Sequence, residues 1–192
     1  MKKIIIFFCF LFISFYVYAD NFNYKININY PITDYKKLNL LTDQKINYYQ
    51  KLFFKEIKNI TFWNEYTLFI NYDGYNYNNI ISYVFFIEYF TGGAHPNHDI
   101  FTFNYDLMND KFIDSVYNLD KISKYARSNL IKDKRIVNTG MLFEGTKPTN
   151  DNFKNFVFTE NGYLFYFKRY QIAPYSSGDI SLVIPYKIEK KD

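Results

Sequence analysis

The fold is decided by residues 152–188, which read NFKNFVFTENGYLFYFKRYQIAPYSSGDISLVIPYKI. Asn161-Gly162 is the strongest short-range signal of a β-hairpin, because a type I′ turn needs a positive φ at both central residues. With a two-residue loop at this pair, Phe158 faces Phe165 across the hairpin. Side chains alternate along a strand, so four phenylalanines share one face: Phe156, Phe158, Phe165 and Phe167. We expect this face to be buried against a helix.

Apolar periodicity places the other elements along the chain. Before the hairpin, the patterns predict strands over residues 24–30, 66–73, 80–90 and 100–105. Two helices are predicted, one over Thr42–Lys58 with Thr42 as its N-cap and a second with Asp120 as its N-cap. Asp73-Gly74 marks a turn, and the polar residues 138–151 are typical of a loop.

This order of elements predicts the fold class. Strands and helices do not alternate strictly, as they do in a parallel sheet, and a last strand over 180–184 follows the hairpin. The sequence therefore predicts an α+β fold, a mainly antiparallel β-sheet with two helices packed on one face. We see no internal repeat or linker.

The N-terminus has the pattern of a cleaved signal peptide. Lys2 and Lys3 precede an apolar run over residues 4–18, and Ala19 follows as a small residue at the cleavage point. The run is shorter than the roughly 20 apolar residues that a spanning helix needs. We therefore expect residues 1–19 to be removed, which leaves a single periplasmic or extracellular domain over residues 20–192 without a membrane span. An uncleaved N-terminal anchor is the alternative.

Composition argues against nucleic-acid binding and against disulfide bonds in the exported chain. Removal of Lys2 and Lys3 lowers the formal charge from +4 to +2, and no basic run of the nucleic-acid-binding kind remains. Cys9 lies in the apolar run, so the exported chain has no cysteine and no disulfide. Aromatic residues make up 23% of the chain, but Lys, Asn and Ile are frequent with them. This favours biased composition and core filling over a sugar-binding platform.

A first cluster of candidate ligands lies in TGGAHPNHD, Thr91–Asp99. His95 and His98 belong to a His-x-x-His-Asp sequence, and metal sites use such side chains. A structural zinc site needs four ligands, however, and the exported chain has no further histidine or cysteine, so we predict no metal site. The alternative is a connection between strands in which Gly92 and Gly93 supply special backbone angles and His95 makes a buried hydrogen bond.

A second candidate is the corner at Tyr170–Gly178. Pro174 and Gly178 are typical turn residues, and Tyr170 and Tyr175 are expected to pack or hydrogen-bond there. A ligand groove at this corner is the alternative. Nucleophilic catalysis finds no support, because the chain has neither a Gly-x-Ser-x-Gly sequence nor an exported cysteine. We therefore predict a protein that is not an enzyme and that uses no cofactor.

The C-terminal motif resembles a known family. An Asn-Phe pair, a Gly-led aromatic strand and YQIAPYSSGDISLVIPY are similar to the C-terminal domain of RsiV, a membrane anti-sigma factor. This family is called domain of unknown function 3298. It also occurs as an accessory domain beside the catalytic domain of PdaC-type peptidoglycan deacetylases. The Gly-Gly-Ala-His segment at residues 92–95 is similar to the family's other recurrent motif.

The resemblance implies binding outside the cell, because RsiV senses lysozyme there and controls a sigma factor inside. Only residues 1–3 precede the apolar run, so we expect no cytoplasmic anti-sigma domain. We expect an exported, non-catalytic binding module of the bacterial cell envelope that recognises a lysozyme-like protein or a cell-wall glycan. The candidate ligand-binding residues are Gly92, Gly93, His95, His98, Tyr170 and Tyr175. The alternatives are an envelope hydrolase or metal-dependent enzyme that uses His95 and His98, and a purely structural envelope protein.

Overall fold

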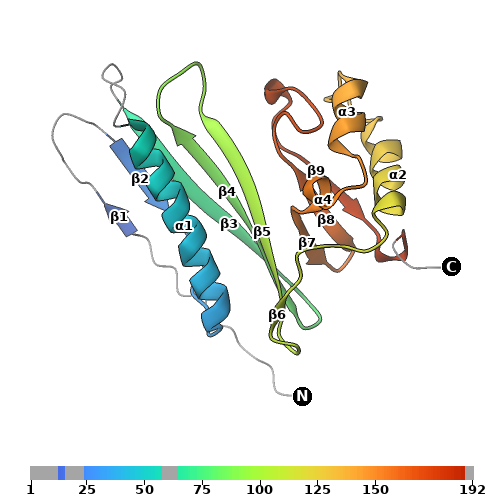
Figure 1. Cartoon of the computed structure of the whole chain (residues 1–192), viewed down its shortest axis with the longest axis horizontal. Coiled ribbons are helices and arrows are strands. Elements are labelled where there is room, and N and C mark those ends of the chain that lie inside the picture. Colours follow the sequence, from blue (N-terminus) through green and yellow to red (C-terminus); the bar gives the residue numbers. More distant parts are fainter. Residues whose placement is uncertain (1–12, 16–23, 58–64, 189–192) are drawn as a thin grey trace. The chain divides into compact units, whose positions relative to one another are not determined.

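The computed structural model describes residues 13–15, 24–57 and 65–188. Nine strands and four α-helices form in this part of the chain (Figure 1). The strands are β1 (Ile13–Phe15), β2 (Tyr24–Ile28), β3 (Tyr66–Tyr77), β4 (Ile80–Phe90), β5 (Asn97–Asp106), β6 (Lys111–Phe112), β7 (Phe156–Thr159), β8 (Gly162–Phe167) and β9 (Ile180–Ile184). The helices are α1 (Lys36–Ile57), α2 (Leu119–Leu130), α3 (Thr139–Gly145) and α4 (Asn150–Phe153), with 3₁₀ turns η1 (Tyr175–Ser177) and η2 (Tyr186–Ile188).

The strands form two sheets. One has six strands in the order β1-β2-β3-β4-β5-β6, and the other has three in the order β7-β8-β9. The pairs β1-β2, β5-β6, β7-β8 and β8-β9 are antiparallel, whereas β2 and β3 are parallel. The predicted α+β class is confirmed.

The chain divides into two compact units. The N-terminal unit comprises Met1–Tyr72 and Phe86–His98, and the C-terminal unit comprises Asp73–Phe85 and Asp99–Asp192. Strands β3, β4 and β5 contribute residues to both units. The single domain expected over residues 20–192 stays a prediction.

The N-terminal unit contains a β2-α1-β3 crossover. Two parallel strands need a long connection, and α1 supplies it. One face of α1 is buried. Its residues recur at helical spacing and are Leu38, Thr42, Ile46, Tyr49, Phe53 and Ile57. The rings of Phe53 and Phe54 pack edge-on against Tyr24 of β2, at centroid distances of 6.4 and 5.4 Å. Among the described residues, no helix combines the length and the apolar composition that crossing a membrane requires.

Helix α1 begins at Lys36, so the prediction that Thr42 caps it is wrong. Thr42 is instead a buried residue in the second turn of the helix. The start is held by Asn39, whose side chain accepts from the backbone N–H of Thr33 at 3.0 Å and donates to its carbonyl at 2.7 Å. The Thr33 hydroxyl in turn accepts from the N–H of Tyr35 at 3.1 Å. The bond from Tyr35 satisfies a backbone donor at the helix start, and the bonds to Thr33 fix the segment that leads into the helix.

The turn expected at Asp73-Gly74 is also displaced. Both residues lie within β3, and the turn to β4 falls at Asn78 and Asn79. Asn78 has φ 51°, a left-handed conformation that asparagine tolerates better than most residues. A second turn, over residues 107–110, joins β5 to β6, with φ 49° at Asp110.

The C-terminal unit is built around the predicted hairpin, β7-β8. The observed register pairs Phe156 with Phe165 and Phe158 with Tyr163, so the predicted register is wrong by two residues. A shift of two preserves the alternation of side chains. The four predicted phenylalanines therefore still share a face, and all four are buried, as predicted: Phe156, Phe158, Phe165 and Phe167.

Gly162 explains the shift. It is the first residue of β8 rather than a turn residue, with φ 138°. A Cβ atom at this position would lie 2.3 Å from the carbonyl oxygen of Ile184 in β9. The turn consists of Glu160 and Asn161, and the Thr159 hydroxyl closes it by donating to the Gly162 carbonyl at 2.8 Å. The glycine is required by close packing against β9 as well as by its own φ.

Helices cover the phenylalanine face, as predicted. One core cluster joins the hairpin to Ile122, Ala126 and Leu130 of α2, Leu142 of α3 and Phe153 of α4. The N-cap position of α2 is Asn118 and Asp120 lies in the first turn, so the prediction that Asp120 caps this helix is wrong. Residues 138–151, predicted as a loop, hold α3 and the start of α4. The Asn138 side chain accepts from the N–H of Met141, and that of Thr149 from the N–H of Asn152, so both short helices have a capped start.

Candidate functional site

The connection between β4 and β5 spans residues 91–96, so His98, predicted in the loop, lies in β5. Gly92 and Gly93 have φ values of 101° and 123°, which confirms that they supply backbone angles that other residues rarely adopt. His95 is exposed, so the prediction of a buried hydrogen bond is wrong. Its Nδ1 lies 2.9 Å from the carbonyl oxygen of the adjacent Pro96.

His98 contacts a carboxylate of the neighbouring strand. Its Nε2 lies 3.2 Å from Oε2 of Glu88 in β4. The Thr91 hydroxyl donates to Oε2 of Glu56 in α1 at 2.8 Å, which ties the loop to the helix. In the part of the chain that the structure describes, no group of three or more His, Cys, Asp and Glu residues is placed to hold a metal ion.

The second candidate, the corner at Tyr170, has an exposed aromatic residue on a special backbone. Tyr170 has φ 66°, a left-handed conformation that is uncommon for a bulky residue, and 59% of it is exposed. Its ring centroid lies 5.7 Å from that of Tyr175 in η1. The two candidate tyrosines of this corner are therefore neighbours.

Arg169 fixes Tyr175. The guanidinium carbon of Arg169 lies 4.5 Å from the centroid of the Tyr175 ring, within the range of a cation–π contact. Nε of Arg169 also donates to Oδ1 of Asp179 at 3.1 Å. The residue preceding Tyr170 is thus anchored on both sides, which holds the corner in place.

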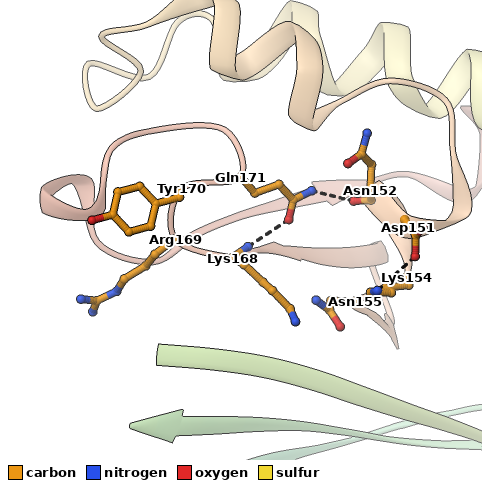
Figure 2. Close-up of a pocket in the computed structure, with 8 residues that line it drawn as sticks. All are labelled: Asp151, Asn152, Lys154, Asn155, Lys168, Arg169, Tyr170 and Gln171. Carbon is orange, nitrogen blue, oxygen red and sulfur yellow. Dashed lines mark hydrogen bonds and ion pairs between the residues drawn. The ribbon is translucent and has the colours of Figure 1, made fainter. Parts of the chain in front are cut away.

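Beside this corner is an open pocket of about 350 Å³ (Figure 2). Its residues come from α4, from the segment leading into β7 and from the segment that follows β8. They are Asp151, Asn152, Lys154, Asn155, Lys168, Arg169, Tyr170 and Gln171. All of these residues are polar or carry a polar group, so hydrogen bonding dominates the chemistry of this surface.

Gln171 ties the walls of the pocket together. Its Nε2 donates to the carbonyl oxygen of Asn152 at 2.9 Å, and its Oε1 accepts from the N–H of Lys168 at 3.1 Å (Figure 2). The same Nε2 also donates to the carbonyl oxygen of Gly145 at 3.0 Å. Asn152 extends this network, because its Nδ2 donates to the carbonyl oxygens of Glu144 and Lys147. The pocket therefore has a preorganised frame, which lowers the entropic cost of binding.

The charged side chains of the pocket are held by carboxylates. Nζ of Lys154 lies 3.1 Å from Oδ1 of Asp151, and Lys168 forms an ion pair with Asp99 of β5. The third cationic residue of the lining, Arg169, is paired with Asp179, so each of the three cations has a carboxylate partner and the positive charge of the pocket is balanced.

Sequence reasoning found only Tyr170 among the residues that line this pocket. The others are common polar residues without a motif, and the structure brings residues 151–155 and 168–171 together through the β7-β8 hairpin. One signal was present. Two basic residues, Lys168 and Arg169, directly follow an aromatic strand, which places charge at the end of a buried element.

Comparison with known proteins assigns this region to a family. Residues 105–187 match the family described as "Protein of unknown function (DUF3298)". This part of the chain belongs to the DUF3298 family. All of the pocket residues lie within the DUF3298 segment, whereas the connection at residues 91–96 precedes it.

The chain is also similar to a curated protein, the peptidoglycan-N-acetylmuramic acid deacetylase PdaC of Bacillus subtilis. The two are 31% identical over 186 residues, which cover 90% of this chain and 39% of the deacetylase. The chain thus spans about two fifths of the length of that relative.

Two solved structures of DUF3298 proteins have a similar fold. A family member from Bacteroides fragilis has a TM-score of 0.58 at 19% identity, covering 94% of this chain and 90% of that chain. A member from Pseudomonas aeruginosa has a TM-score of 0.64 at 15% identity, covering 94% and 91%. The fold described above is therefore that of the DUF3298 proteins over nearly the whole chain.

Proposed function

We propose that this chain is an exported, non-catalytic binding module of the bacterial cell envelope and that its pocket beside Tyr170 binds envelope glycan. The observation that carries the proposal is the lining of this pocket, in which an exposed tyrosine lies alongside amide, ammonium and guanidinium groups. Binding sites of this kind combine a few placed polar groups with an aromatic surface.

The chemistry of peptidoglycan suits this lining. Its sugars carry hydroxyl and acetamido groups, which exchange hydrogen bonds with side chains such as that of Asn155, and C–H faces that pack on an aromatic ring such as that of Tyr170. Peptidoglycan also carries carboxylates, on its peptide stems and on lactyl groups that bear no peptide, and ammonium and guanidinium groups such as those of the lining bind carboxylates by charge-assisted hydrogen bonds. Similarity to a peptidoglycan-N-acetylmuramic acid deacetylase supports the same choice of ligand.

The proposal is tested with purified peptidoglycan and the exported protein. We expect the protein to sediment with peptidoglycan and to bind soluble muropeptides in calorimetric titrations. Oligomers of N-acetylglucosamine lack the carboxylate and are expected to bind about tenfold more weakly, the equivalent of one charge-assisted hydrogen bond.

A matched pair of variants assigns the binding to the pocket. Tyr170→Asn removes the ring but retains a residue that tolerates a left-handed backbone, so folding should be preserved. Tyr117→Asn removes a tyrosine that is 83% exposed in the same unit but lies outside the pocket lining. We expect Tyr170→Asn to weaken binding by about tenfold or more and Tyr117→Asn to leave it unchanged. Equal binding by both variants, or no binding by the unchanged protein, would overturn the proposal.

A further inference from the structure

The outer edge of the six-stranded sheet is covered by a strand from the predicted signal peptide. Strand β1 pairs antiparallel with β2, with Ile13 opposite Ile28 and Phe15 opposite Ile26. Residues 13–15 lie within the segment 1–19 that we expect to be removed on export. In the exported chain β2 would then be an edge strand, and edge strands are templates for pairing with another chain.

A hydrogen bond of the residue that directly follows β2 shows which main-chain groups this edge would present. The N–H of Asn29 donates to the carbonyl oxygen of Ile70 in β3 at 2.8 Å. Main-chain groups of successive residues point to opposite sides of a strand. The groups of Ile26 and Ile28 therefore point away from β3, towards the position of β1, and they need partners once that strand is absent.

A small pocket lies between the same strand and α1. It has a volume of about 160 Å³ and is lined by Ile26, Ile28, Tyr30, Asp43, Ile46, Asn47 and Gln50. Three isoleucines make much of its surface apolar, and polar residues of the helix surround it. Strand addition to a sheet edge uses this combination, because main-chain bonds supply affinity and adjacent pockets select side chains.

We propose that the β2 edge of the exported chain binds an extended segment of a partner protein, added antiparallel in the place of β1. The occupant has apolar residues at two alternate positions, because the covering strand reads Ile-Ser-Phe in this register. One apolar side chain of the segment enters the pocket beside Ile26 and Ile28, which is large enough for a leucine-sized group. This site is separate from the proposed glycan pocket, which belongs to the C-terminal unit.

The test uses peptides that differ only in their main chain. The probe is a soluble peptide with an Ile-Ser-Phe core flanked by lysines, titrated into the exported protein whose N-terminus has been determined. In the observed register Ile13 and Phe15 are opposite residues whose main-chain groups point to the edge, so their N–H groups donate to β2, whereas that of Ser14 points away. N-methylation at the serine is expected to leave the affinity unchanged, and N-methylation at the phenylalanine to reduce it about tenfold or more.

Two protein variants test the pocket. Asn47→Trp fills it from an exposed position on α1, and Lys51→Trp places the same ring on the same helix at an exposed position outside the pocket. We expect only Asn47→Trp to weaken peptide binding. Equal effects of the two N-methyl groups, no binding of the probe, or self-association of the protein that excludes the peptide would each overturn the proposal.

Discussion

Phe165 lies at the centre of the aromatic packing that holds the C-terminal unit together. Its ring contacts Phe153 of α4 edge-on at a centroid distance of 5.4 Å and Phe156 of β7 at 5.6 Å. Since it is 1% exposed, Phe165→Ala should lower the free energy of unfolding by about 3–5 kcal/mol through lost burial and a cavity. Val183→Ala in the adjacent strand is the control, with an expected loss below about 1 kcal/mol because Val183 is exposed. Denaturant melts measure both, and equal losses would contradict the prediction.

Tyr186 is a tyrosine whose titration should affect stability in alkali. Its hydroxyl donates to the carbonyl oxygen of Thr159 at 2.7 Å, and its ring stacks on Tyr77. Burial, followed by the charge of Tyr77, raises the pKa of Tyr186 to about 12. The folded state therefore keeps this proton at a pH where the unfolded state loses it, and the free energy of unfolding falls between pH 10 and about 12.

A replacement without the hydroxyl isolates this effect. Tyr186→Phe should reduce the pH dependence of the unfolding free energy in that range by about one proton. Melts at a series of alkaline pH values measure the slope, and an ultraviolet titration of tyrosinate shows whether one late-titrating group is lost. An unchanged slope in the variant would mean that another group controls alkaline unfolding.

At the scale of elements, the β7-β8 hairpin depends on close packing at Gly162. Gly162→Ala should destabilise the protein by about 3 kcal/mol or more, because the new Cβ meets the backbone of Ile184 and cannot be accommodated by a side-chain movement. Gly93→Ala is the matched control, since Gly93 also has a positive φ but has no atom within 4 Å of the new Cβ. We expect a loss of about 1–2 kcal/mol there, from the backbone alone. Thermal melts compare the two, and equal losses would show that φ decides both.

The hairpin also shows how far sequence patterns reach. Alternation of the phenylalanines predicted which face is buried, because that depends only on the period of the strand. The pattern did not predict the register of the hairpin. Asn161-Gly162 indicated a turn at that pair, but close contact with Ile184, which is distant in sequence, places Gly162 in the strand. A local signal was thus overridden by a tertiary contact.

Other elements depended on similarly distant contacts. The amphipathic pattern predicted the buried face of α1. The parallel pairing of β2 with β3, the strands that α1 connects, has no signal in the local sequence. Helices α3 and α4 are too short for a periodic pattern, although their capping residues Asn138 and Thr149 were visible. Tyr170 was the only residue of the candidate pocket that was predicted, because the other lining residues are brought together only by the folding of the chain.

At the scale of the whole molecule, we predict that export removes residues 1–19. The charged start, the short apolar run and Ala19 predict cleavage that leaves Asp20 as the N-terminus. Mass spectrometry of the protein purified from the organism's envelope or medium checks this directly. A membrane-bound chain that keeps residues 1–19 would refute the prediction.

The charge of the whole chain bears on lysozyme-like proteins, the partners that the family resemblance implies. Common lysozymes are basic, and the exported chain has an expected charge of +2, so long-range attraction between them should be absent. Affinity must then come from a few desolvated anchors, for which the exposed Tyr170 is a candidate. We predict modest lysozyme binding that depends weakly on salt, measured by calorimetry at low and moderate ionic strength. Tight binding that collapses as salt rises would reveal an acidic surface patch, because screening weakens only long-range charge interactions. No heat at high lysozyme concentration would exclude lysozyme as the partner, and glycan binding at the Tyr170 pocket would be unaffected by that result.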